Sequence, residues 1–114
     1  MKTTLAVTTL SLLLAGSLAF GQDKQAKGAP GVAAKGKEVF ESNCSVCHNS
    51  DSTEIKVGPG LKGLFKHAAL NNKKKVTEAN VREMINMGGN GMPSYEDMLT
   101  AAEKADVIAF LKTL

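Results

Sequence analysis

Residues 44–48 read Cys44-Ser45-Val46-Cys47-His48 and contain both cysteines of the chain. Two cysteines three positions apart, near the end of a predicted helix, project their sulfur atoms to one side. The histidine that follows the second cysteine can then offer an imidazole nitrogen to a metal at the same place. This C-x-x-C-H pattern is typical of c-type haem attachment, in which the sulfurs bind the porphyrin covalently and the histidine is an axial iron ligand.

Three other chemistries could use the same residues. A redox dithiol is typical of a βαβ context, and strand patterns are absent from this sequence. A zinc site could recruit Cys44, Cys47, His48 and His67, although adjacent Cys47 and His48 make a poor tetrahedral chelate. A disulfide between the two cysteines would close a very small loop and constrain little. Covalent attachment of one haem is the interpretation we favour.

Helical patterns lie on both sides of the motif. Residues 32–43 carry apolar side chains at spacings of three and four, which predicts a helix that leads into it. Thr77 caps a second predicted helix that runs to about Met87 and ends at Gly88. Thr100 opens a last helix, with Glu103 completing a capping box.

The remaining segments are predicted to be loops, with one short helical turn over residues 61–65. Val107, Phe110, Leu111 and Leu114 form an apolar stripe on the last helix. The fold class is therefore all-α, with three to four helices and long loops. With four Phe, one Tyr and no Trp, the chain has few aromatic side chains for a core. A domain this small is thermodynamically marginal without a disulfide, metal or cofactor, so we expect the loops to wrap around the haem.

The first residues resemble an export signal rather than a folded segment. Lys2 precedes an apolar run over residues 5–20, and small residues follow where a signal peptidase would cut. We expect a signal peptide over residues 1–21 with cleavage near 19–22, a flexible segment over 22–31, and one domain over 32–114. The apolar run is short for a membrane span, so an uncleaved anchor is the weaker alternative and no stable membrane insertion is expected. Export predicts a periplasmic location.

The net charge of +3 is too weak and dispersed to indicate nucleic-acid binding, and no recognition motif accompanies it. Residues 73–75 form a short cluster of three lysines. The cluster is either a solvated loop or a docking patch for an acidic partner.

A haem iron bound by His48 alone would have its second axial position open, and several side chains could fill it. The candidates are Met84, Met87, Met92, Met98 and His67. Met84 belongs to the apolar face of its predicted helix, which favours a core role, and Met87 and Met98 have no distinctive context. Met92 follows a glycine-rich loop that would let the backbone approach a flat cofactor, and Pro93 fixes the direction of the chain. Met92 is the best candidate on these grounds.

Residues 33–114 resemble the monohaem class I cytochrome c family of the small bacterial type. The resemblance rests on five elements in order: Gly36 with Phe40, Cys44–His48, Gly58–Leu61, Gly91–Pro93 and Ile108–Leu111.

The resemblance implies a small cytochrome c fold with His48 and Met92 as iron ligands. It also implies that the Pro59 carbonyl accepts a hydrogen bond from the other ring nitrogen of His48. Gly36 and Phe40 would meet Val107 and Phe110 where the first and last helices cross, and Tyr95 would lie beside the haem edge. The chain departs from larger members in having no Trp and no clear Arg for the haem propionates.

These features together predict an electron-transfer protein rather than an enzyme. We expect an exported monomer that carries single electrons between periplasmic redox proteins, with a ring of lysines steering it toward acidic partners (Lys62, Lys66 and Lys73–Lys75). One alternative is a haem subunit of a periplasmic dehydrogenase or oxidase. Another is a haem enzyme or gas-binding protein with an open distal site.

Overall fold

The computed structural model describes residues 29–114, and within that range it contains helices and no β-strand. The elements in order are α1 (Ala33–Asn43), the short 3₁₀ helix η1 (Leu64–Lys66), α2 (Glu78–Met87) and α3 (Ala101–Leu111). The predicted all-α class is confirmed. The expected signal peptide, its cleavage region and most of the expected flexible segment lie outside the described residues.

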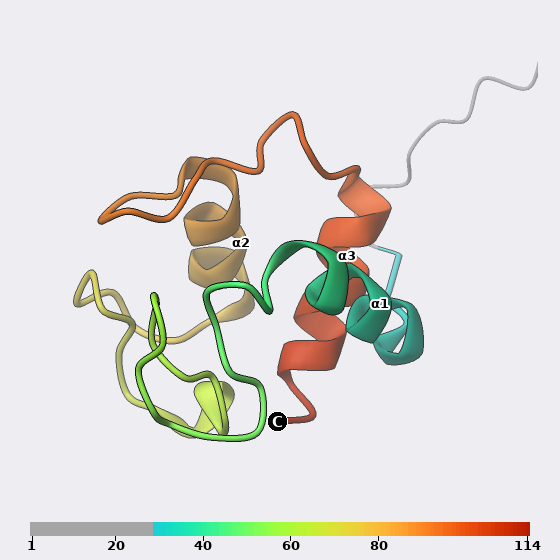
Figure 1. Cartoon of the computed structure of the whole chain (residues 1–114). Coiled ribbons are helices and arrows are strands. Elements are labelled where there is room, and N and C mark those ends of the chain that lie inside the picture. The colour runs from blue at the N-terminus through green and yellow to red at the C-terminus, as the bar shows by residue number, and fades with distance from the viewer. Residues whose placement is uncertain (1–28) are drawn as a thin grey trace, which may run out of the picture.

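The first and last helices cross closely (Figure 1). Gly36 is buried at the crossing, and a Cβ atom there would lie 1.9 Å from the Asp106 carbonyl oxygen and 2.9 Å from Cβ of Phe110. The rings of Phe40 and Phe110 pack with their centroids 5.4 Å apart. The predicted crossing is thus confirmed, with one difference: Gly36 faces the backbone of Asp106, and Val107 is buried in the core beside it.

Helices α2 and α3 begin at local side-chain caps, as their sequences predict. The Thr77 hydroxyl accepts from the Asn80 amide, and Thr100 and Glu103 form a capping box. Helix α1 begins differently, because Val32 offers no capping side chain. The backbone amide of Val32 donates instead to Oδ1 of Asp106 at 2.7 Å, so a residue of α3 caps α1.

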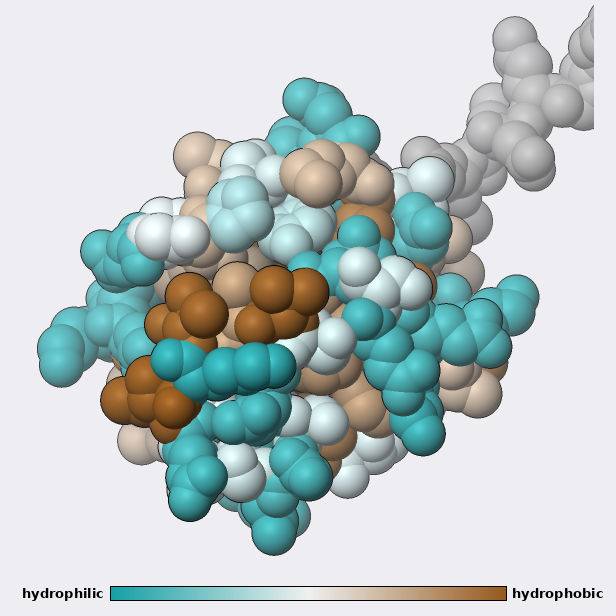
Figure 2. All heavy atoms as spheres, in the orientation of Figure 1, coloured by the Kyte–Doolittle hydropathy of each residue, from teal (hydrophilic) through white to brown (hydrophobic). Residues whose placement is uncertain are grey.

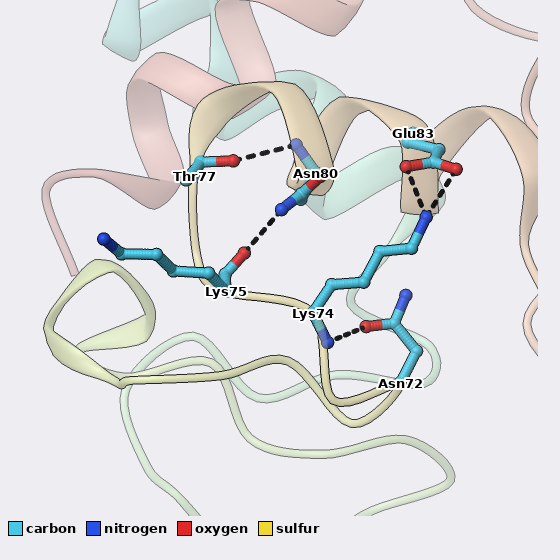
Figure 3. A network of polar contacts seen from close by, with 6 residues as sticks. All are labelled: Asn72, Lys74, Lys75, Thr77, Asn80 and Glu83. Atoms are coloured by element: carbon cyan, nitrogen blue, oxygen red, sulfur yellow. Dashed lines mark hydrogen bonds and ion pairs between the residues drawn. The ribbon is translucent and has the colours of Figure 1, made fainter.

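Helix α2 packs on α3. The long stretch between α1 and α2, which includes η1, extends to one side of the α1–α3 pair (Figure 1), and Leu64 of η1 joins the common core. Polar contacts hold the loop before α2 in place (Figure 3). The Asn80 amide group donates to the Lys75 carbonyl at 2.9 Å, and the Lys74 ammonium lies 2.7 Å from the Glu83 carboxylate. In residues 29–114 no helix has the length and apolarity needed to cross a membrane.

The core draws on loops as well as helices. Its buried apolar members are Phe40, Leu64, Val81, Ile85, Tyr95, Leu99, Val107, Ile108 and Leu111. One charged side chain joins them: Lys104 is 7% exposed and its ammonium donates to the Glu96 carbonyl at 2.7 Å. Three of the buried residues, Leu64, Tyr95 and Leu99, lie outside the α-helices, so the loops that flank α2 are part of the packed structure.

Candidate haem site

The C-x-x-C-H motif forms a tight turn at the end of α1. The Cys44 amide donates to the Phe40 carbonyl at 2.8 Å, and the amides of Cys47 and His48 both donate to the Cys44 carbonyl, at 3.0 and 2.9 Å. Both cysteines are half-buried and neither is in a disulfide. Burial, reinforced by the neighbouring Cys47, raises the pKa of the Cys44 thiol to about 11. The turn therefore offers a protonated thiol, a second thiol and an imidazole within five residues.

The imidazole of His48 is held by the carbonyl of Pro59. The distance from Nδ1 to the carbonyl oxygen is 2.7 Å, so the contact that the family resemblance implies is present. A carbonyl can only accept, so Nδ1 must carry the proton, and in the neutral imidazole Nε2 then keeps its lone pair. Such a hydrogen bond fixes the tautomer and the orientation of a metal-binding histidine.

The segment around Pro59 is itself bound to the motif. The Gly58 amide donates to the Cys47 carbonyl and the Lys56 ammonium donates to the Ser45 carbonyl, both at 2.8 Å. A Cβ atom at Gly58 would lie 2.6 Å from Cε1 of His48, which is closer than carbon atoms can pack. Glycine is thus required for the imidazole to lie flat against this loop. Gly58 is one of the residues on which the family resemblance rests, whereas nothing in the sequence pointed to Lys56.

Met92 lies at the end of a tight turn that starts at Gly89. The Gly89 amide donates to the Met92 carbonyl at 2.9 Å, and the Met92 amide donates back at 3.1 Å. The two central residues, Asn90 and Gly91, have φ values of 53° and 90°. Positive φ at both positions is typical of a type I′ turn, for which Asn-Gly is the favoured pair. The turn fixes the backbone on both sides of the Met92 side chain, which is half-buried against the core.

The other candidates for a second axial ligand have different surroundings. Met87 and Met98 are 71% and 63% exposed, and His67 is also exposed. Met84 is half-buried on α2. Within residues 29–114, no group of three or more His, Cys, Asp and Glu side chains is arranged to hold a metal ion.

This set of donors fits a covalently attached haem. Two free thiols match the two vinyl groups, an imidazole with one free nitrogen matches one axial position, and a half-buried thioether is available for the other. Apolar side chains also gather on the face shown in Figure 2. Val46, Ile55 and Val57, in and just after the motif, are 70%, 80% and 75% exposed. Exposed apolar surface of this kind is typically used for contact with a cofactor or partner.

The chain is similar to known proteins. A family model described as "Cytochrome C oxidase, cbb3-type, subunit III" matches residues 31–111. The chain belongs to the cytochrome c family. Members of this family bind haem c covalently and are electron-transfer proteins rather than enzymes, so those predictions are confirmed.

Relatives of the cytochrome agree with this assignment. Cytochrome c-550 of Bacillus subtilis is 33% identical over 81% of this chain and 67% of its own length. Cytochrome c6 of Leptolyngbya boryana is 38% identical over 60% and 75%, and cytochrome c2 of Rhodopila globiformis is 28% identical over 75% and 95%.

A solved structure supports the fold as well. Cytochrome c6 from the diatom Phaeodactylum tricornutum superposes with a TM-score of 0.59, at 24% identity, covering 73% of this chain and 93% of that one. The expected small cytochrome c fold is therefore confirmed.

Proposed function

We propose that this cytochrome carries single electrons between redox proteins of the periplasm. Its haem would be attached through Cys44 and Cys47, with His48 and Met92 as the two iron ligands. The observation that carries the proposal is the 2.7 Å hydrogen bond from His48 to Pro59, beside two free thiols, because it leaves one imidazole nitrogen ready to bind a metal. Residues 1–21 would direct export, residues 22–31 would link to the domain, and residues 32–114 would form it.

When bound, the haem supplies a ferric–ferrous couple whose potential depends on the axial ligands. The polypeptide supplies the axial ligands and holds them in position. Pro59 holds the imidazole in one orientation, and Gly58 keeps the loop close to it. Met92 would fill the second axial position, which excludes small molecules from the iron and limits rearrangement during electron transfer. A half-buried apolar setting disfavours the extra positive charge of the ferric state, so it raises the potential.

The direct test uses protein matured in a host that attaches haem. We expect the mass of one haem to be added, and a near-infrared sulfur-to-iron band in the ferric protein. Met92→Ala should abolish that band. Met98→Ala should leave it unchanged, because Met98 is 63% exposed. A purified protein of apoprotein mass, or a native iron that binds carbon monoxide without delay, would contradict the proposal.

Export makes a separate prediction about the N-terminus. The mature protein should be recovered from the periplasmic fraction, and its N-terminal sequence should begin near residues 20–23. Recovery of the full-length chain with Met1 intact would instead support a retained leader.

The exposed lysines are proposed to steer partners. Lys73 and Lys75 have no ion pair among the described side chains, whereas Lys74 is neutralised by Glu83 at 2.7 Å. Long-range attraction of this kind is screened by salt. Lys75→Glu should slow reduction of anionic ferricyanide and speed that of cationic tris(phenanthroline)cobalt(III), with both effects lost at high salt. Lys35→Glu, the same charge change on α1, should have a smaller effect; equal effects of the two variants would show that only net charge matters.

A second candidate is a haem subunit within a larger complex. The description of the matching family model, which names an oxidase subunit, favours it. The chemistry of the site would be the same, with one permanent partner in place of several transient ones. Affinity purification from the native membrane would separate the two: stoichiometric recovery of larger chains supports a subunit, and recovery of the cytochrome alone supports a carrier.

A further inference from the structure

The only tyrosine of the chain joins two segments that the sequence keeps far apart. Tyr95 is 9% exposed, and its hydroxyl donates to the Asn43 carbonyl at 2.7 Å, across 52 positions. Asn43 is the last residue of α1 and directly precedes Cys44. Its carbonyl is one of those that a helix leaves without an intrahelical partner, and the tyrosine satisfies it.

The surroundings of the ring place it beside the haem motif. Burial is the main cause that raises the pKa of Tyr95, and the free thiols of the nearby Cys44 and Cys47 add to it before haem is attached. The phenol therefore keeps its proton at neutral pH and remains a hydrogen-bond donor. It lies three residues after Met92 and so belongs to the same loop.

Other hydrogen bonds of this loop connect it to α2 and α3. The Ser94 hydroxyl donates to the Asn86 carbonyl at 2.5 Å and the Tyr95 amide donates to the Ile85 carbonyl at 3.0 Å, both on α2. The Glu96 carbonyl accepts from Lys104 on α3. Within residues 29–114, the Tyr95 hydroxyl makes the only hydrogen bond between residues 88–99 and residues 33–48. Apart from iron itself, it is the direct polar link between the Met92 loop and the segment that carries His48.

We propose that Tyr95 is a positioning residue that holds Met92 at bonding distance from the iron. The inference rests on the proposed function, in which Met92 is the second axial ligand. A methionine thioether is a neutral and weak ligand, so small displacements of its loop should favour competing ligands. The turn over residues 89–92 is tied to itself by two hydrogen bonds, so it would move as a unit with Tyr95.

Tyr95→Phe tests the proposal by removing one oxygen atom and keeping the ring. We expect imidazole to bind the ferric holoprotein about five- to tenfold more tightly than in the wild type, the factor that one buried hydrogen bond typically contributes. Ser94→Ala is the matched control. It removes a bond that ties the same loop to α2 rather than to the segment carrying His48, so it should lower the melting temperature and change imidazole binding clearly less than Tyr95→Phe does.

A second measurement works even if Tyr95→Phe folds poorly. Because the chain has a single tyrosine, biosynthetic replacement by 3-fluorotyrosine alters Tyr95 alone. The more acidic phenol is a stronger donor, so imidazole binding should weaken. Unchanged imidazole affinity in both proteins, or an equal gain in Ser94→Ala, would overturn the role of Tyr95 while leaving Met92 as ligand. A wild-type protein without the near-infrared band would overturn Met92 ligation, and the role of Tyr95 with it.

Discussion

The imidazole of His48 occupies its place because Gly58 has no Cβ atom. The imidazole lies so close to the backbone that a Cβ atom at residue 58 would be 2.6 Å from Cε1 and 2.9 Å from Nδ1. The same ring nitrogen is held by Pro59, so the imidazole cannot turn away without losing its hydrogen bond. The position of the proposed iron ligand therefore depends on the absence of a side chain one residue before Pro59.

Gly58→Ala should disturb the iron as well as the fold. The added methyl group must push the imidazole or the loop aside, and overpacking of this kind typically costs about 1–3 kcal/mol. We expect a lower melting temperature together with a changed reduction potential. Gly63→Ala is a suitable control, because the new methyl group would meet only the Lys66 side chain at 3.9 Å. Its positive φ of 67° adds strain, so it should lower stability but leave the potential unchanged.

Among the elements, α1 is unusual because its N-terminal cap comes from another helix. The carboxylate of Asp106 accepts from the Val32 amide at 2.7 Å and also brings a negative charge to the positive end of the helix dipole. The caps of α2 and α3 are within three residues of the amides they satisfy, and the sequence predicted both. The cap of α1 spans 74 positions, so no local pattern could indicate it.

Asp106→Ala should lower the free energy of unfolding by about 1 kcal/mol, the usual contribution of a capping side chain. Asp106→Asn keeps an acceptor oxygen but loses the charge, so its loss should be smaller. Urea unfolding of the holoprotein measures both. Equal losses in the two variants would mean that the charge, rather than the hydrogen bond, carries the effect.

The same contrast between local and distant signals explains what the sequence could predict. The helices, two of their caps and the candidate ligands follow from spacings of a few residues. The burial of Lys104 does not, because a lysine at a helical position normally points to solvent, and here the Glu96 carbonyl eight residues earlier receives it. The Asn90-Gly91 turn was predictable in principle from its residue pair, whereas the prediction for this segment is only a glycine-rich loop.

At the scale of the whole molecule, Lys112 connects three elements near the C-terminus. Its ammonium lies 2.6 Å from Glu78 at the start of α2 and 5.8 Å from the centre of the Phe65 ring in η1. The hydrogen bond from Lys112, with a smaller contribution from Arg82, lowers the pKa of Glu78. A carboxylate with a lowered pKa stabilises the fold above its unfolded pKa, and this stabilisation is lost as the pH falls through the lowered value.

Glu78→Gln should therefore lower the melting temperature at pH 7 but not at a pH well below 4. The ion pair is largely exposed, so its contribution should stay below about 1 kcal/mol, or a few degrees in melting temperature. Thermal unfolding at both pH values tests this. A difference that persists in acid would indicate that packing of the Glu78 side chain, and not its charge, is responsible.

Haem attachment should also decide the stability of the molecule as a whole. Among residues 29–114 few apolar side chains are fully buried, and much of the stretch between α1 and α2 is loop. Replacing Cys44 and Cys47 by serine together should abolish covalent attachment and with it a cooperative thermal transition in circular dichroism. Replacing Cys44 alone leaves one thioether possible and should give an intermediate melting temperature. A double variant as stable as the wild type would show that the polypeptide supplies its own core.

The pairing of α1 with α3 has a consequence for how the molecule comes into being. Contacts between the two ends of a chain are slow to form, because a long loop must close first. Until α3 docks on α1, Phe40 lacks its contact with Phe110 and the beginning of α1 lacks its cap from Asp106. The two cysteines directly after α1 should therefore stay accessible for haem attachment until this late pairing is made.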